Sequence, residues 1–339
     1  MNRRDLGALI IVAWPQTPVR RTGFWYDGLF GLLGLQLGGG LYRLGHAGCL
    51  LVSENIGRAH YFDCGRYECP PQMSRIRDEL HDAELAISVH ARFAADGSLA
   101  NSEEVLLALA GNRATHGEGF MVASVMGGLD FEAAYHEAKR LQARMYPFRH
   151  LAFRSLNCTR FILRMTRFAS APLIVRALEA WSALFGPSPL FLVRVANFLG
   201  PIYMVDQGRL SHSGRWSAFL RGRPPVLPSP AHERCEGSSL PPQREAGVPI
   251  EARWLSGTGA GKWIALTREP GLASREFRFR RWSGSGRQDC DRVFALREGD
   301  EFDPARPFEP DYPTHCQECT LRQDGRTLRL ELSREFAPS

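Results

Sequence analysis

The sequence of 339 residues predicts a two-domain protein in which an α+β domain precedes a small all-β domain. The first observation is that apolar runs with strand and helix periodicity alternate along residues 1–221. The second is that residues 222–249 are rich in proline, serine, glycine and charge, which is typical of a linker. The third is that residues 250–335 contain only short alternating strand patterns, which predict a β-rich accessory domain.

Strand predictions in the first domain rest on apolar runs bounded by turn residues. Residues 41–52 and 58–65 flank the turn Ser53-Glu54-Asn55-Ile56-Gly57 and predict a β-hairpin. The apolar run over residues 7–14 ends at Pro15 without a small-residue cleavage site, so we interpret this run as a buried strand and not as a signal peptide. The other strands are expected at residues 7–14, 84–93 and 120–125.

Helix predictions rest on capping residues that precede apolar residues at helical spacing. Ser102, Asp130 and Asn157 are good helix-starting residues, and each stands immediately before or at such a pattern. The predicted helices cover residues 24–37 (a short one), 102–110, 131–145, a segment from 158 onward, and 172–185.

The second domain is predicted to contain a glycine-rich hairpin, Gly257-Thr258-Gly259-Ala260-Gly261-Lys262. A phosphate-binding loop needs a glycine where Ser256 stands, and a serine or threonine where Trp263 follows the lysine. We therefore expect a strand connection and not a nucleotide site. The predicted strands of this domain are residues 250–255, 262–267, 274–282, 292–296, 319–322 and 327–332.

Charge is unevenly distributed along the chain, whose formal net charge is +6. Nine arginines stand against Glu179 and Asp206 between Arg160 and Arg223, among many apolar residues. A basic apolar segment of this kind either packs on the core or lies on an anionic membrane surface, which makes such a surface a candidate partner. Nucleic acid is not an expected partner, because no binding motif accompanies the charge.

Localisation is predicted from what the sequence contains. No segment reaches the roughly 18 apolar residues that span a bilayer. The eight cysteines are scattered, mostly within apolar runs, which predicts a reduced, cytoplasmic chain. Delivery by a contact-dependent secretion machine would not require a signal peptide either, so that route stays open.

The stretch Asn157-Cys158-Thr159-Arg160-Phe161 predicts a reactive thiol. Cys158 would lie in the first turn of a helix, where free backbone N–H groups and the helix dipole favour a thiolate. A proton acceptor is available upstream, because His46 begins an apolar strand. If Cys158 and His46 meet in space, the pair predicts a cysteine hydrolase or acyltransferase.

A third residue that orients His46 is expected on the return strand of the hairpin. If the hairpin pivots about Asn55, His60 lies opposite Leu50 and shares a face with His46. If the register slips by one residue, Asp63 takes that face instead. His60 is the first candidate for the third position, and Asp63 is the alternative.

The order of a histidine strand, a return strand and then a cysteine helix resembles the circularly permuted branch of the papain-like NlpC/P60 superfamily, which includes lecithin:retinol acyltransferase-like and PPPDE-like enzymes. The resemblance rests on Gly45-His46-Ala47 and on Asn157-Cys158 followed by Phe161, and covers roughly residues 40–170. It implies an antiparallel sheet packed on helices. The whole chain also resembles a bacterial family known only as a domain of unknown function.

The resemblance implies that Cys158 is the nucleophile, that His46 is the general base, and that His60 or Asp63 orients the imidazole. An acyl-enzyme would form, with the oxyanion held at the start of the cysteine helix. The expected substrate is an acyl amide in a peptide, an isopeptide or a cell-wall peptide. The candidate substrate-contacting residues are Tyr42, Asn157, Arg66, His116 and His90.

Two alternatives to an amide hydrolase stay open. The same site would serve a phospholipase or acyltransferase that acts on lipids, and the basic apolar segment favours that reading. A binding protein that keeps the fold without activity is the other alternative. No cofactor or catalytic metal is expected, although Cys290, His315, Cys316 and Cys319 form a candidate set of structural zinc ligands.

Overall fold

The computed structural model describes residues 5–24, 27–32, 34–37, 40–150, 155–196, 200–213 and 241–336. The chain divides into two compact units. The first unit comprises Met1–Gly65, Ile76–Asp78 and Leu85–Pro228, and the second comprises Arg66–Arg75, Glu79–Glu84 and Ser229–Ser339. The second unit therefore takes in two short segments that the sequence analysis placed within the first domain. The predicted linker lies outside the described residues up to position 240, and residues 241–249 belong to the second unit.

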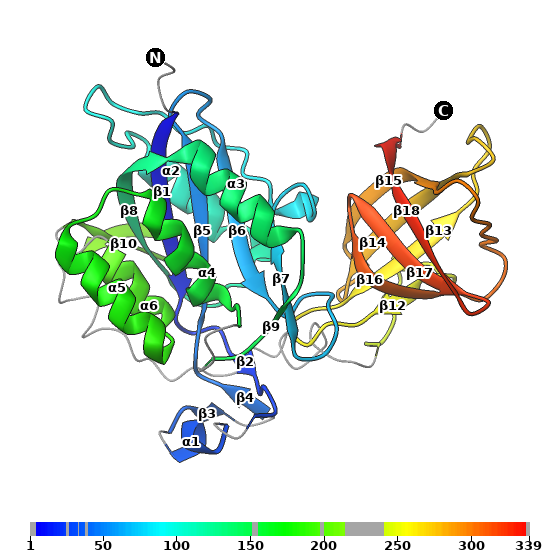
Figure 1. Cartoon of the computed structure of the whole chain (residues 1–339), viewed down its shortest axis with the longest axis horizontal. Helices are drawn as coiled ribbons and strands as arrows, with labels where there is room; N and C mark the ends of the chain where they lie inside the picture. Colours follow the sequence, from blue (N-terminus) through cyan, green and yellow to red (C-terminus); the bar gives the residue numbers. More distant parts are fainter. Residues whose placement is uncertain are drawn as a thin grey trace. The chain divides into compact units, whose positions relative to one another are not determined.

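The first unit is a mixed α/β unit built on an eight-stranded sheet in the order β11-β10-β8-β1-β5-β6-β7-β9 (Figure 1). The central strand β1 pairs antiparallel with β5 and β8, and β5 pairs antiparallel with β6. The strands are β1 Leu6–Trp14, β5 His46–Ser53, β6 Ala59–Gly65, β7 Met73–Arg77, β8 Met121–Asp130, β9 Tyr146–Pro147, β10 Ile202–Asp206 and β11 Arg209–Ser213.

Alternating side chains of the sheet build two cores, one on each face. Leu9 and Ile11 of β1 pack with residues of α3, α4 and α6, whereas Ile10 and Val12 pack with α2 and the segment that precedes it. Figure 1 shows α3 and α4 crossing one face of this sheet and α2 on the other. The helices are α2 Ser102–Ala110, α3 Phe131–Gln142, α4 Cys158–Met165, α5 Leu173–Phe185 and α6 Pro189–Ala196.

A small three-stranded sheet precedes β5 and interrupts the long strand that the sequence predicted over residues 41–52. Its order is β2-β4-β3, and helix α1 lies between β2 and β3 in the chain. Gly45 separates β4 from β5 with a φ of +74°, and a Cβ there would lie 3.0 Å from the Trp14 carbonyl oxygen. The chain therefore turns at this glycine. The elements are β2 Val19–Arg20, α1 Asp27–Leu32, β3 Gln36–Leu37 and β4 Leu41–Tyr42.

The predicted strand over residues 84–93 is wrong. A 3-10 turn, Ala83–Leu85, is followed by irregular chain whose Ala91 N–H donates to the Gly57 carbonyl. Helix α6, which we did not predict, begins at Pro189, where the missing N–H costs nothing. Among the described residues, no helix is both long enough and apolar enough to cross a membrane.

The second unit is an all-β, near-barrel sheet of seven antiparallel strands in the order β12-β13-β14-β15-β18-β17-β16, whose end strands β12 and β16 also touch. Strand β16 was missed because it contains Pro310 and Pro313, which are uncommon in strands. The strands are β12 Arg253–Leu255, β13 Lys262–Thr267, β14 Glu276–Ser283, β15 Gln288–Leu296, β16 Glu309–His315, β17 Glu318–Gln323 and β18 Arg326–Glu335.

The glycine-rich segment joins β12 to β13 as a hairpin, as predicted. Lys262 at its end is buried and pairs with Glu84, at 2.8 Å, and with Asp289, at 2.5 Å. Arg281 is also fully buried and pairs with Asp82 and Asp289. Lys262 is therefore part of a buried ion-pair network.

Candidate active site

The structure brings Cys158, His46 and Asp63 together at the junction of three elements of the first unit. His46 is the first residue of β5, Asp63 lies on β6, and Cys158 is the first residue of α4. His46 Nε2 lies 3.2 Å from Asp63 Oδ2, and Cys158 interacts with the same imidazole closely enough to help raise the pKa of His46. The imidazole is therefore a neighbour of both the carboxylate and the thiol.

Asn157 fixes the start of α4 and with it the position of Cys158. Its side-chain oxygen accepts hydrogen bonds from the Arg160 N–H, at 2.9 Å, and from the Thr159 hydroxyl, at 3.0 Å. Its amide group donates to the Arg149 carbonyl at 3.2 Å. The prediction that Asn157 caps this helix is confirmed. These contacts commit its buried side chain to the helix start and not to a substrate.

The register of the β5–β6 hairpin decides which residue faces His46. The expected pairing of His60 with Leu50 is wrong, because His60 pairs with Leu51 and Asp63 pairs with Gly48. The reason lies in the turn: Ser53 N–H donates to the Arg58 carbonyl, so four residues intervene and the pivot falls between Asn55 and Ile56. A shift of one residue exchanges the two faces of a strand.

His60 consequently lies on the face opposite His46. Its ring packs against Tyr135 and Phe131 of α3, at centroid distances of 5.0 and 5.8 Å. Asp63, the alternative in the sequence analysis, lies beside His46 instead. The geometry therefore puts Asp63, and not His60, within hydrogen-bond distance of His46.

The Asp63 carboxylate receives further donors that the sequence analysis missed. Arg77 of β7 donates from Nε to Oδ1 at 3.0 Å and from Nη2 to Oδ2 at 2.6 Å. The Tyr61 hydroxyl donates to Oδ2 at 3.2 Å. The strand period of two put Tyr61 on the face of Asp63, but no local pattern pointed to Arg77.

Burial and charge act in opposite directions on the two ionisable partners. Burial lowers the pKa of His46, but hydrogen bonds to Asp63 and Cys158 and their negative charges outweigh it and raise this pKa to about 9. Burial raises the pKa of Asp63, but the Arg77 charge and the hydrogen bonds from His46 and Arg77 hold it well below its usual range. At neutral pH the site therefore favours an imidazolium beside a carboxylate.

Two neighbours complete the surroundings of His46 and Asp63. The Trp14 ring stacks on the imidazole at 5.9 Å with an interplanar angle of 15°. Burial and the Asp63 charge raise the pKa of the Cys49 thiol, so Cys49 stays neutral. Of the cysteines in the described ranges, only Cys158 is not buried.

The other predicted substrate residues are dispersed. The Tyr42 side chain is buried, and its hydroxyl donates to the Asp27 carbonyl at 3.0 Å. His90 is exposed, and its carbonyl accepts a hydrogen bond from the side chain of Asn101. Arg66 belongs to the second unit.

The loop that contains His116 packs beside the site. His116 has a φ of +55° and ends a 3-10 turn. A Cβ at Gly117 would lie 2.2 Å from the ring of Trp14, so this glycine lets the loop lie directly on the tryptophan that stacks on His46. The loop is tied there, because the Glu118 N–H donates to the Thr17 hydroxyl at 2.9 Å.

The candidate zinc ligands of the second unit have other partners. Cys290, Cys316 and Cys319 pack in the apolar core of the second unit, and the His315 ring stacks on His81 at 3.9 Å. Among the residues that the structure describes, no three histidine, cysteine, aspartate or glutamate side chains are grouped as a metal site requires.

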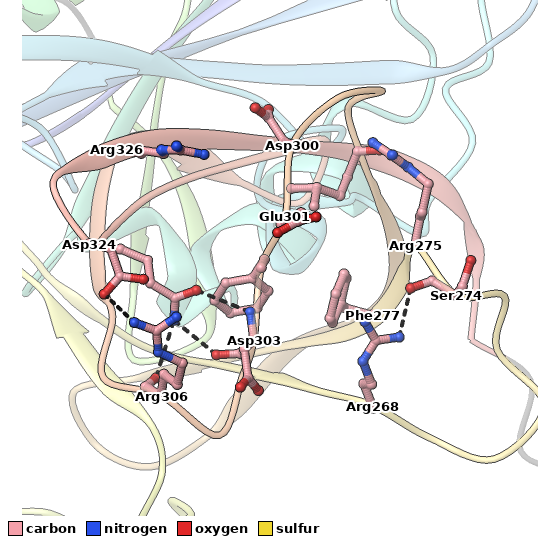
Figure 2. Close-up of a pocket in the computed structure, with 13 residues that line it drawn as sticks. Arg268, Ser274, Arg275, Phe277, Asp300, Glu301, Asp303, Arg306, Asp324 and Arg326 are labelled. Atoms are coloured by element: carbon pink, nitrogen blue, oxygen red, sulfur yellow. Dashed lines mark hydrogen bonds and ion pairs between the residues drawn. The ribbon is translucent and has the colours of Figure 1, made fainter.

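A cavity of about 760 Å³ lies in the second unit, over the buried side chains of Phe277, Leu296 and Phe302. Its rim carries arginines and carboxylates (Figure 2). Arg306 pairs with Asp324 at 2.7 Å, and Arg268 donates to the Ser274 carbonyl at 2.7 Å. The cavity contains no residue that the sequence analysis singled out.

Comparisons with known proteins found two family models and a solved structure that are similar to parts of this chain. Residues 9–171 match the model of the type VI secretion system effector TseH-like family, and residues 252–333 match the DUF6695 C-terminal domain. The crystal structure of the type VI secretion system effector TseH matches 62% of this chain and 99% of its own, with 17% identity and a TM-score of 0.42. No curated protein matches the chain. The first match spans His46, Asp63, Arg77 and Cys158.

Proposed function

We propose that the first unit is a cysteine hydrolase in which Cys158 is the nucleophile, His46 the general acid and base, and Asp63 the residue that orients His46. The observation that supports this proposal is the neighbourhood of His46, whose imidazole contacts Asp63 at 3.2 Å and interacts with Cys158 at the start of α4. The order of histidine strand and cysteine helix supports a permuted papain-like arrangement.

The proposed reaction has two halves. In the proposed resting site His46 already holds the proton that Cys158 has given up. The Cys158 thiolate attacks the acyl carbon, while the carbonyl oxygen becomes an oxyanion beside the N–H groups at the start of α4. The imidazolium then protonates the leaving group, and a thioester remains. In the second half, His46 removes a proton from water, the hydroxide displaces the thiol, and the free acid leaves.

An amide is the substrate class that the electrostatics of His46 support. An amine leaves an acyl centre only when its nitrogen is protonated, whereas an alkoxide needs this help less. The hydrogen bond to Asp63 and that carboxylate's charge keep the imidazole protonated near neutral pH. We therefore propose a peptide, an isopeptide or a cell-wall peptide as substrate.

We propose further that the chain is delivered as an effector by a type VI secretion system. The match of residues 9–171 to the TseH-like family supports this proposal. The cytoplasm of the producing cell, which the sequence analysis expected as the location, would then be where the chain is made and not where it acts.

The first experiment measures the rate at which iodoacetamide alkylates Cys158, by mass spectrometry of the labelled peptides near neutral pH. We expect Cys158 to react faster than the buried thiols, and we expect His46→Ala and Asp63→Asn to slow it. The matched control is His60→Gln, which changes a histidine on the other face of β6 and should leave the rate unchanged. Equally slow labelling of all thiols would favour a non-catalytic binding protein.

The second experiment tests turnover on peptides, isopeptides and cell-wall fragments by amine release. Cys158→Ala should abolish release and keep the fold, because the Cys158 side chain is part-exposed. Amine release that persists in Cys158→Ala would exclude Cys158 as the nucleophile.

A lipid substrate is the second candidate, and the surface of α5 favours it. This helix exposes Leu173, Ile174 and Trp181, whereas Val175 and Glu179 on its other side are buried. Apolar side chains exposed on a helix in an arginine-rich segment fit an anionic membrane surface. Co-sedimentation with anionic but not zwitterionic vesicles, weakened by Trp181→Ser, is the expected result. Absence of binding to either vesicle removes this candidate.

A further inference from the structure

Arg77 is a residue of the first unit to which the proposed reaction assigns no role. Its side chain is fully buried, and both ends of its short segment are tied to α3. The Gln142 amide group donates to the Ile76 carbonyl at 3.4 Å, and the Lys139 ammonium donates to Asp78 Oδ2 at 2.7 Å. Helix α3 therefore fixes the backbone on either side of Arg77.

The guanidinium contacts the Asp63 carboxylate in the two-pronged geometry that constrains a carboxylate most strongly. Nε and Nη2 reach different oxygens, at 3.0 and 2.6 Å, so the carboxylate is held against rotation. Held in this orientation, Oδ2 lies 3.2 Å from both His46 Nε2 and the Tyr61 hydroxyl. One oxygen thus serves Arg77, Tyr61 and His46 together.

The backbone of β5 leaves space for this arrangement. Gly48 lies opposite Asp63 in the hairpin, and a Cβ at Gly48 would come within 2.5 Å of the Tyr61 hydroxyl oxygen. Every group around the carboxylate is buried, so no bulk water replaces a lost donor. The carboxylate depends on its protein partners alone for its charge and its direction.

We propose that Arg77 is a positioning residue of the Cys158 site, which acts through Asp63 by keeping this buried carboxylate ionised and aimed at His46. The inference rests on the proposed function, in which His46 accepts the proton of Cys158. Both donors of Arg77 that reach the site contact the Asp63 carboxylate, so Arg77 acts through Asp63 in this proposal.

The physical reason is the cost of a buried charge. A carboxylate in an apolar site takes up a proton unless a cation or several donors compensate it. Among the described residues, the charged and titratable groups that contact Asp63 are Arg77, His46 and the Tyr61 hydroxyl, and those that act on His46 are Asp63 and Cys158. Cys49 lies on the other face of β5, and its buried thiol stays neutral. Without Arg77, Asp63 becomes neutral and no longer stabilises the imidazolium that forms as Cys158 ionises.

The test follows the alkylation rate of Cys158 by iodoacetamide across the pH range from about 5 to 10. In Arg77→Gln labelling at neutral pH should slow, and the midpoint of the rate profile should move to higher pH. A move of one pH unit slows labelling about tenfold on the acid side. Arg77→Lys keeps the charge but loses the two-pronged contact, so its midpoint should lie between the two.

A double-mutant cycle separates this role from a merely structural one. Asp63→Asn should move the midpoint as Arg77→Gln does, and adding Arg77→Gln to Asp63→Asn should cause no further movement. We expect the double variant to fold, because replacing both partners leaves no unpaired buried charge. Tyr61→Phe, which removes one uncharged donor, is the matched control and should move the midpoint least.

The outcomes distinguish the two proposals. If Cys158 of the unmodified protein labels no faster than the buried thiols, the proposed function itself fails. If Asp63→Asn moves the midpoint while Arg77→Lys or a folded Arg77→Gln keeps the original one, only the inference about Arg77 fails. An equal movement caused by Arg77→Gln with and without Asp63 present would also overturn it.

Discussion

Protonation of His46 is linked to the stability of the first unit, and the magnitude follows from the structure. The pKa of His46 is raised from 6.5 to about 9. One pKa unit corresponds to about 1.4 kcal/mol, so the difference corresponds to about 3 kcal/mol of unfolding free energy. Because the folded-state pKa is the higher one, this stabilisation is fully present below pH 6.5 and is lost as the pH rises through 9.

The measurement is urea denaturation of the full chain and of His46→Gln, followed by tryptophan fluorescence from about pH 6 to 10. The difference between the two proteins cancels the contribution of the second unit. We expect the advantage of the unmodified protein to shrink by about 3 kcal/mol between the two ends of this range. His60→Gln is the matched control, and its difference from the unmodified protein should vary much less with pH.

Two results would refute this reasoning. A constant difference between the unmodified protein and His46→Gln over the whole pH range would mean that folding leaves the pKa of His46 unchanged. A difference that grows with pH would mean that burial, which opposes the imidazolium, outweighs Asp63 and Cys158.

Three further predictions concern the supporting structure. Gly48→Ala should displace the Tyr61 ring and destabilise the first unit by about 1–3 kcal/mol in urea, whereas the same change at Gly127 of β8, where a Cβ meets nothing within 4 Å, should cost less than half of that. Asn157→Ala should cost about 1 kcal/mol and slow alkylation of Cys158, because the helix start loses its cap; an unchanged alkylation rate would contradict the role of the cap. Lys262→Met should destabilise the second unit by about 3 kcal/mol, because Glu84 and Asp289 each lose one cation and keep Arg287 and Arg281, respectively; a stability near that of the unmodified protein would contradict the buried ion pairs.

Much of the local structure was predictable because its causes are local. Capping by Asn157, the strand that begins at His46 and the helix that begins at Cys158 each follow from a few neighbouring residues. The glycine-rich hairpin before Lys262 was also recognised from adjacent residues. The prediction of a strand over residues 84–93 was wrong because contacts with distant residues determine the conformation of this segment. The Ala91 N–H, for example, donates to the Gly57 carbonyl.

The sequence by itself determined that a thiol at a helix start and a strand histidine were the candidates for chemistry, and it narrowed the third position to His60 or Asp63. Only the tertiary structure chose between them, because the choice depends on one residue of hairpin register and hence on the length of the turn at Ser53–Arg58. Arg77 lay outside any local pattern for the same reason. Arg77 and Asp63 lie on different strands of one sheet. The spacing of residues along the chain does not predict which charged side chain contacts a buried carboxylate on another strand.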